Sequence, residues 1–115
     1  MKLFNLNIGI KIDNNEEIIK LIKEDNYDII TLQEVMRKIE DLAFDRYDSS
    51  NVIKNNIFYK NSFFGPLWIA SHHKKNNVMT RNFGGLVEQG NEILTKYQII
   101  DAKNIFYYKN YGPYI

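Results

Sequence analysis

Residues 27–35, YDIITLQEV, form an apolar run that stops at the polar pair Gln33 and Glu34. A nearly continuous apolar run is typical of a strand that is covered on both faces of a sheet. Carboxylates are rarely buried in such positions unless they are paired. We therefore expect the side chain of Glu34 to leave the core at the end of the strand and to face solvent or a ligand.

The residues before this run predict a strand and a helix. Residues 1–10 alternate between apolar and other side chains, which predicts a strand that ends near Gly9. Residues 13–26, DNNEEIIKLIKEDN, predict a helix whose N-terminus Asn14 or Asn15 can cap. A strand, a helix and a strand within about thirty residues make a βαβ unit. We therefore expect two parallel neighbouring strands joined by a right-handed crossover.

Two polar residues, Asn7 and Glu34, fall at the carboxyl ends of these two strands. Ligands bind at that edge of open α/β sheets, so we expect both side chains to face one site. Two ordinary explanations stand beside this one. Glu34 would then be a surface carboxylate at a strand end, and Asn7 would form a turn before Gly9.

The remaining residues give less regular patterns. Residues 35–44 predict a helix, and residues 48–61 predict a second, short helix capped by Asp48 or Ser49. Further along, the pattern predicts a strand at 63–71 entered through a Gly65-Pro66 turn, a polar loop at 72–85, and two strands at 91–100 and 104–110 joined by a hairpin turn at 101–103.

Composition limits the class of protein. The 115 residues are 44% hydrophobic and 25% charged, which favours one small globular domain, or part of a larger one, over disorder. A formal charge of +1 disfavours a protein that coats polyanions, and the lack of cysteine excludes disulfides and cysteine-based zinc sites. No apolar stretch reaches the roughly 20 residues that span a bilayer. Asn5 and Asn7 interrupt any signal-peptide pattern, so we expect a soluble, cytoplasmic chain.

Three segments, in this order, resemble the endonuclease/exonuclease/phosphatase superfamily, the deoxyribonuclease-I-like fold. They are LFNLNIG at 3–9, NYDIITLQEV at 26–35 and GNEILTKYQII at 90–100. The resemblance implies an α/β (α+β) architecture, the N-terminal half of a four-layer α/β sandwich with a βαβ start and a mixed sheet. It also implies that residues 1–115 are a single partial domain whose C-terminal half is absent. The family's later Asp-x-Asn and Ser-Asp-His segments have no counterpart after residue 100.

The same resemblance implies the N-terminal portion of a Mg²⁺-dependent phosphoesterase, with Mn²⁺ as the alternative metal. Glu34 matches the family's metal-binding Glu, and Asn7 matches the Asn that orients the metal shell or holds a phosphate oxygen. Both are candidate catalytic residues. Asn91 matches the family's Gly-Asn pair and is a candidate substrate-binding residue, with a turn or bulge role equally open. The family's water-activating Asp and catalytic His belong to the absent half, so we expect little or no activity from this chain alone.

Several other features carry less weight. Gly9 replaces a polar residue that some family members use near the metal. His72 and His73 lie in the polar stretch SHHKKNN and are interpreted as part of a solvated loop. The glycines at 84, 85 and 90 form no phosphate-binding motif. Alternating basic and aromatic residues can bind single-stranded nucleic acid, but here they are interpreted as ordinary strand composition.

Two other functions remain open at this stage. The first is a non-catalytic truncated module that binds a partner chain or a phosphate ligand. The second is an unrelated small α/β nucleotide-binding domain, which the lack of a glycine-rich phosphate motif disfavours. For the phosphoesterase, the expected partners are a phosphoester substrate, with nucleic acid among the candidates. Half of a sandwich also exposes the inner face of its sheet, so we expect self-association or a complementing C-terminal segment.

Overall fold

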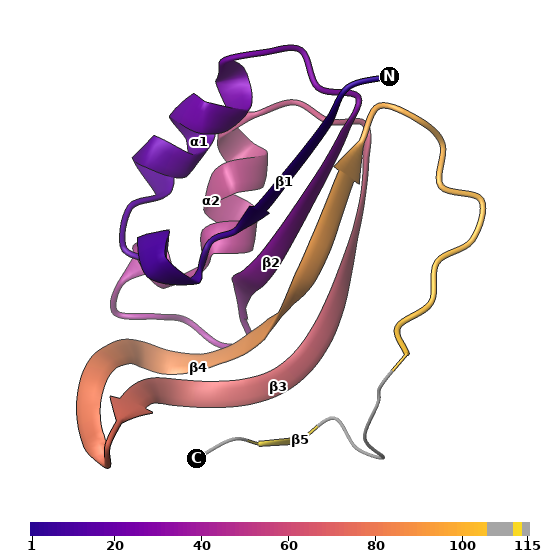
Figure 1. The fold of residues 1–115 in the computed structure, drawn as a ribbon. Helices are drawn as coiled ribbons and strands as arrows, with labels where there is room; N and C mark the ends of the chain where they lie inside the picture. Colours follow the sequence, from indigo (N-terminus) through magenta and orange to yellow (C-terminus); the bar gives the residue numbers. More distant parts are fainter. Residues whose placement is uncertain (106–111, 114–115) are drawn as a thin grey trace.

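The structure is a computed structural model that describes residues 1–105 and 112–113. Figure 1 shows one twisted sheet with two helices packed on one of its faces. The elements, in chain order, are β1 (Leu3–Asn7), the 3₁₀ helix η1 (Gly9–Lys11), α1 (Asn15–Lys23), β2 (Ile29–Lys38), the 3₁₀ helix η2 (Asp45–Tyr47), α2 (Ser49–Asn56), β3 (Asn61–Lys75), β4 (Val78–Thr95) and β5 (Gly112–Pro113).

The predicted βαβ start is confirmed. Strands β1 and β2 pair in parallel, from Leu3 opposite Ile29 to Asn7 opposite Gln33. Helix α1 connects them, and it begins where the Asn14 side chain accepts the backbone N–H of Glu17 at 3.1 Å. This bond satisfies one of the donors that a helix N-terminus leaves without a partner.

The sheet is mixed, as predicted. Its strand order is β1-β2-β4-β3-β5. The pairs β2–β4 and β3–β4 are antiparallel, whereas β1–β2 and β3–β5 are parallel. The chain is therefore an α/β fold with helices on one face of a mixed sheet. Among the described residues, no helix has the length and apolar character needed to cross a membrane.

Two apolar clusters hold these elements together. The first lies between the two helices and the sheet, and it includes Ile18, Ile22, Ile30, Leu32, Val35 and Ile53. The second lies where the C-terminal part of β2 and the facing part of β4 meet η1 and η2, and it includes Ile12, Met36, Tyr47, Phe83 and Val87. The residues of both clusters are almost fully buried, and burial of this kind provides most of the stability of a small domain.

The predicted loop at 72–85 is wrong. These residues belong to β3 and β4, which form one long antiparallel hairpin with its turn at Asn76 and Asn77. Both turn residues have positive φ, 52° and 63°, a conformation that Asn tolerates better than most residues and that suits a two-residue hairpin turn. The sequence of these residues has no apolar alternation that would predict strands, because this part of the hairpin is largely exposed and needs few apolar side chains.

The predicted turn at Gly65-Pro66 is also wrong, since both residues lie inside β3. Gly90 of β4 pairs with Pro66, and a Cβ atom on Gly90 would lie 2.1 Å from the Gly65 carbonyl oxygen. Glycine at position 90 therefore permits the close approach of the two backbones. Register shifts in β3 and the glycines at 84 and 85 accompany a pronounced bend of the hairpin, which Figure 1 shows curving beneath β2.

Residues 35–44 do not form the predicted helix. Strand β2 continues to Lys38, paired with β4 from Val35 opposite Gly90 to Lys38 opposite Val87. Pairing with a neighbouring strand overrides the helical periodicity of this short segment. The predicted helix after Asp48 is confirmed as α2, and Asp48 occupies its N-cap position.

The predicted strand at 91–100 is only partly correct, because β4 ends at Thr95 and residues 96–105 form neither helix nor strand. The predicted turn at 101–103 is therefore not part of a hairpin. Of the predicted strand at 104–110, the first two residues are not in a strand, and the others lie outside the described residues.

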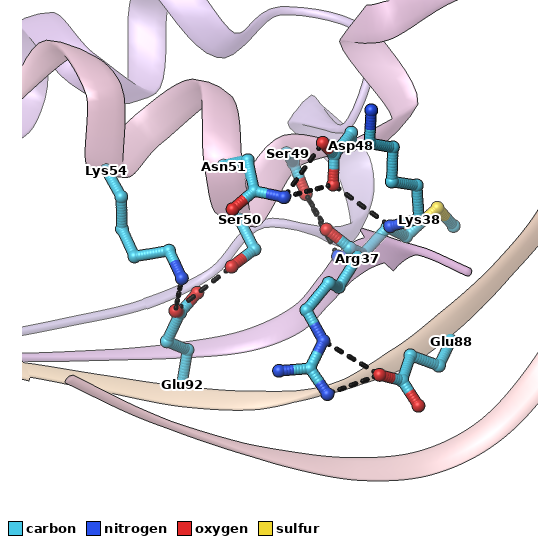
Figure 2. A network of polar contacts seen from close by, with 10 residues as sticks. Arg37, Lys38, Asp48, Ser49, Ser50, Asn51, Lys54, Glu88 and Glu92 are labelled. Atoms are coloured by element: carbon cyan, nitrogen blue, oxygen red, sulfur yellow. Dashed lines mark hydrogen bonds and ion pairs between the residues drawn. The ribbon is translucent and has the colours of Figure 1, made fainter. Parts of the chain in front are cut away.

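A polar network fastens α2 to the sheet (Figure 2). The Glu92 side chain on β4 is only 2% exposed; it accepts a hydrogen bond from Ser50 at 3.0 Å and pairs with Lys54 at 3.4 Å. Burial raises the pKa of Glu92, and Lys54 and Ser50 offset only part of that rise. Beside it, Arg37 of β2 donates from Nε to Glu88 of β4 at 2.7 Å.

The opposite face of the sheet carries no helix in the described part of the chain (Figure 1). It mixes apolar and polar side chains. Leu3 is 61% exposed and Ile93 42% exposed. Between β1 and β2, the Asn5 side-chain oxygen Oδ1 accepts hydrogen bonds from the Thr31 hydroxyl at 2.6 Å and from Gln33 Nε2 at 2.7 Å.

Candidate functional site

The end of β1 brings Asn7 next to Glu34. The Asn7 Oδ1 atom accepts the backbone N–H of Gly9 at 2.9 Å, a contact that closes a turn directly after the strand. The Asn7 Nδ2 group then donates to Glu34 Oε1 at 3.1 Å. The structure therefore places these two side chains next to each other at the carboxyl edge of the parallel strands, and their role in binding a ligand stays a prediction.

Glu34 sits in a β-bulge. Leu32 pairs with Glu92 and Val35 pairs with Gly90, so that Gln33 and Glu34 of β2 together oppose Asn91 of β4. The φ angle of Glu34 is 58°, in the left-handed region. An L-residue in that region costs about 1–2 kcal/mol relative to its usual conformations, and glycine is the residue commonly found there.

Gly9 makes room for the carboxylate. A Cβ atom at this position would lie 1.8 Å from Glu34 Oε2 and 3.1 Å from Asn7 Oδ1. No side chain at position 9 could therefore coexist with the observed position of Glu34. The departure of Gly9 from the polar residue of some family members thus has a structural consequence, because it gives the carboxylate its space.

Sequence reasoning missed two residues of this site, His73 and Arg81. They are cross-strand partners in the β3–β4 hairpin, and the bend of the hairpin carries them to the Glu34 edge. Together with Gly9 and Glu34 they line two adjoining hollows. Asn7 lines the more open of the two hollows. The other hollow has a volume of about 180 Å³, and its lining includes three apolar side chains of the second cluster, Ile12, Met36 and Phe83.

The signal that could have found them is the Asn76-Asn77 pair. Read as a two-residue hairpin turn, it predicts that nearby residues on either side face each other across the two strands. His72 also lies in β3, and its Nδ1 atom contacts the Ser71 hydroxyl at 2.9 Å. The interpretation of both histidines as part of a loop was therefore wrong about the backbone.

Arg81 is held by an ion pair with Asp13, with Nε donating to Asp13 Oδ2 at 2.9 Å. Burial on its own raises the pKa of Asp13, but hydrogen bonds from Arg81 and Tyr47 and the charges of Arg81 and Arg46 outweigh it and lower that pKa. Asp13 is therefore an anion at neutral pH and keeps the guanidinium in place at the rim of the hollow.

Asn91 opposes the bulge through its backbone, but its exposed side chain lines a different hollow. Its other lining residues are Phe63, Gly65, Ile93, Ile99 and residues 101–104. The backbone of Asn91 thus lies opposite Glu34, but the Asn91 side chain does not line the hollows that Glu34 lines. Its role in substrate binding stays a prediction.

The donor set at this edge can be compared with the needs of Mg²⁺. The described residues contain no group of three or more His, Cys, Asp or Glu side chains that could hold a metal. Mg²⁺, however, commonly binds through one or two carboxylates and completes its shell with water and substrate phosphates. Glu34 supplies one such carboxylate, and the Asn7 side-chain oxygen Oδ1 retains a second lone pair beside the bond that it accepts from the Gly9 N–H. These residues are compatible with part of a Mg²⁺ site.

Comparison with solved structures identifies the same fold in longer proteins. The chain is similar to the crystal structure of endonuclease/exonuclease/phosphatase from Beutenbergia cavernae DSM 12333, with a TM-score of 0.61 and 14% identity over 87% of this chain. It is also similar to the endonuclease/exonuclease/phosphatase family protein from Leptotrichia buccalis C-1013-b, with a TM-score of 0.51 and 17% identity over 88% of this chain. No protein-family model and no curated protein matches the sequence.

These likenesses confirm the resemblance inferred from the sequence at the level of the fold. The chain spans 27% of the length of the Beutenbergia protein and 40% of the Leptotrichia protein. It therefore matches only part of the length of each of those proteins.

Proposed function

We propose that this chain is the N-terminal portion of a Mg²⁺-dependent phosphoesterase, in which Glu34 binds the metal and Asn7 positions Glu34. Phosphodiesters and phosphomonoesters are the proposed substrates, with nucleic acid among them, and Mn²⁺ is the alternative metal. The fold shared with the two solved proteins supports this assignment, as does the place of Glu34 at the carboxyl edge of the sheet.

One observation carries the proposal: the backbone of Glu34 lies in the left-handed region, where a glycine would be more stable. Backbone strain of this kind persists when the surrounding structure enforces it, and it concentrates at functional sites. Here the strained residue carries a carboxylate that Asn7 orients and for which Gly9 leaves space. A carboxylate held in this way is suited to binding a hard cation.

A metal ion at this edge would neutralise the phosphoryl oxygens of the substrate and activate water. The residues of this chain contribute the positioning. Asn7 donates one amide hydrogen to Glu34 and thereby leaves Oε2 open toward Gly9. The other amide hydrogen of Asn7 remains available to a phosphate oxygen. Ile12, Met36 and Phe83 form an apolar part of the wall of the same hollow.

The test is divalent-metal binding by the full 115-residue chain, measured by calorimetry with Mg²⁺ and with Mn²⁺. Glu34→Gln keeps the size of the side chain and its acceptor for Asn7, but removes the charge, so we expect affinity to fall about tenfold or more. Glu24→Gln, at the C-terminus of α1, removes one negative charge far from the site and should leave affinity unchanged. Equal affinity in the wild type and Glu34→Gln would refute the metal role.

A second candidate is a non-catalytic module that binds a partner chain. The observation in its favour is the sheet face opposite the helices, on which Leu3 and Ile93 are exposed. Because the chain spans 27% and 40% of the two similar structures, a partner that covers this face is a plausible replacement for the rest of the domain. Glu34-dependent hydrolysis of a phosphodiester by the purified chain would decide against this candidate.

A further inference from the structure

We infer that Arg81, with His73 beside it on the hairpin, forms a binding site for the phosphate group of the substrate, and this rests on the proposed phosphoesterase function. The β3–β4 hairpin thus contributes more than sheet structure. It adds a cationic side to a site whose other side is the Glu34 carboxylate.

The placement of Arg81 comes from the backbone. Residues 73 and 81 pair across the hairpin, and both line the two hollows that Gly9 and Glu34 also line. Since Gly9 and Glu34 belong to η1 and β2, four elements converge at this point. A group bound at Glu34 would therefore lie within the same hollow as the guanidinium of Arg81.

The hydrogen bonds of Arg81 leave its phosphate-binding edge open. The bond to Asp13 uses Nε, and no hydrogen bond among the described residues uses the terminal Nη1 and Nη2 groups. A guanidinium has five N–H donors in a fixed plane, and two of them can bind a phosphate through parallel hydrogen bonds. Asp13 thus anchors one edge of the group while the other edge stays available.

His73 is oriented by Thr80. The Thr80 hydroxyl donates to the His73 carbonyl oxygen at 3.1 Å, and it also contacts His73 Nδ1 at 2.8 Å. Because the hydroxyl has one hydrogen, both contacts are favourable when Nδ1 carries a hydrogen and donates to the hydroxyl oxygen. This arrangement fixes the ring and directs the remaining nitrogen, Nε2, away from Thr80. Thr80 therefore fixes the orientation of the His73 ring beside Arg81 in the proposed phosphate-binding site.

The balance of charge agrees with this assignment. Asp13 compensates part of the positive charge of Arg81, while Arg46 stands near Asp13 and raises the positive potential again. Glu34 alone would repel a phosphate. A metal held by Glu34 would remove that repulsion, and the guanidinium of Arg81 would supply hydrogen bonds to the oxygens of the same phosphate.

The test uses inorganic phosphate with the full chain in the presence of a chelator, so that no metal on Glu34 contributes. Binding is followed by two-dimensional NMR, in which the signals of His73 and Arg81 should shift. We expect Arg81→Gln to weaken phosphate binding about tenfold, and Arg81→Lys to retain part of it as a single point charge. Surface ion pairs contribute little to stability, so both variants should fold.

Two controls separate this proposal from others. Lys75→Gln removes a positive charge from the end of the same hairpin and should leave binding unchanged. Glu34→Gln removes the negative charge that repels phosphate, so in the absence of metal it should bind phosphate more tightly than the wild type. Equal losses in Lys75→Gln and Arg81→Gln, or no loss in Arg81→Gln, would overturn the inference. Failure of the metal role alone would leave these phosphate results in place.

Discussion

The left-handed conformation of Glu34 predicts an unusual order of stability for two substitutions. Glu34→Ala and Glu34→Gly both remove the carboxylate and its hydrogen bond from Asn7, so these losses cancel in the comparison. What differs is the backbone. At a φ of 58° alanine is strained by about 1–2 kcal/mol, whereas glycine is not. Glycine has the more flexible unfolded chain, which costs it about 0.4–1 kcal/mol.

The difference leaves Glu34→Gly more stable than Glu34→Ala by about 1 kcal/mol. At about 2.1 cal/mol/K of unfolding entropy per residue, this corresponds to about 4 °C in Tm for a chain of 115 residues. The free energy of unfolding can be measured by urea denaturation followed by circular dichroism. The matched control is Thr31, in the regular part of the same strand, where glycine should instead be less stable than alanine by about 0.5–1 kcal/mol. The same order at both positions would refute the bulge geometry on which the site is built.

Three further predictions concern other parts of the molecule. Gly9→Ala should displace Glu34 Oε2 without unfolding the chain, because the atom that the new Cβ meets is the end of a flexible side chain. Calorimetry should show Mg²⁺ affinity reduced by about tenfold to 100-fold, since one hydrogen bond to a charged group contributes about 1.5–3 kcal/mol. Because the pKa of Glu92 is raised in the folded chain, protonated Glu92 stabilises the fold fully below pH 4.5, its ordinary pKa, and this stabilisation is lost as the pH rises through the folded-state pKa. The Tm of Glu92→Gln relative to the wild type should therefore rise between acid and neutral pH. A Tm difference that stays constant with pH would contradict this. Ile93→Lys, on the sheet face without helices, should reduce self-association in sedimentation velocity, and a wild-type chain that is monomeric at high concentration would remove the basis for this prediction.

The sequence was sufficient for the parts of the fold that depend on local patterns. Alternation in residues 1–10 and the capped helix that begins at Asn15 led directly to the βαβ unit, and the carboxyl ends of its strands led to Asn7 and Glu34. The helix after Asp48 followed from its capping residues. In each case the segment carries its own signal.

The rest depends on partners that are distant in the chain. His73 and Arg81 belong to exposed strands with few apolar side chains, so their pairing is visible only once the hairpin turn is known. Residues 35–38 have a helical pattern, but β4 supplies the hydrogen bonds that make them a strand. The bulge at Glu34 is defined by what lies opposite it, Asn91, and no property of residues 27–35 alone reveals it.

The bulge explains how an apolar strand can carry one residue that is not part of the core. Strand β1 ends opposite Gln33, and beyond that point β2 pairs only with β4 within the described part of the sheet. In a regular strand Leu32 and Val35 would face opposite sides, because they are three residues apart. The extra residue shifts the alternation, so that both are fully buried in the same cluster.

Burial of Val35 therefore explains why the strand has a bulge, but it does not explain which residue occupies it. Glycine would provide the same shift with less strain. The carboxylate at this position adds nothing to the core, since Glu34 is exposed, and it depends on Gly9 for space and on Asn7 for orientation. Burial of Val35 thus requires one extra residue in the strand, at position 34. That this residue is a strained glutamate, where glycine would be more stable, is the observation that indicates a functional role.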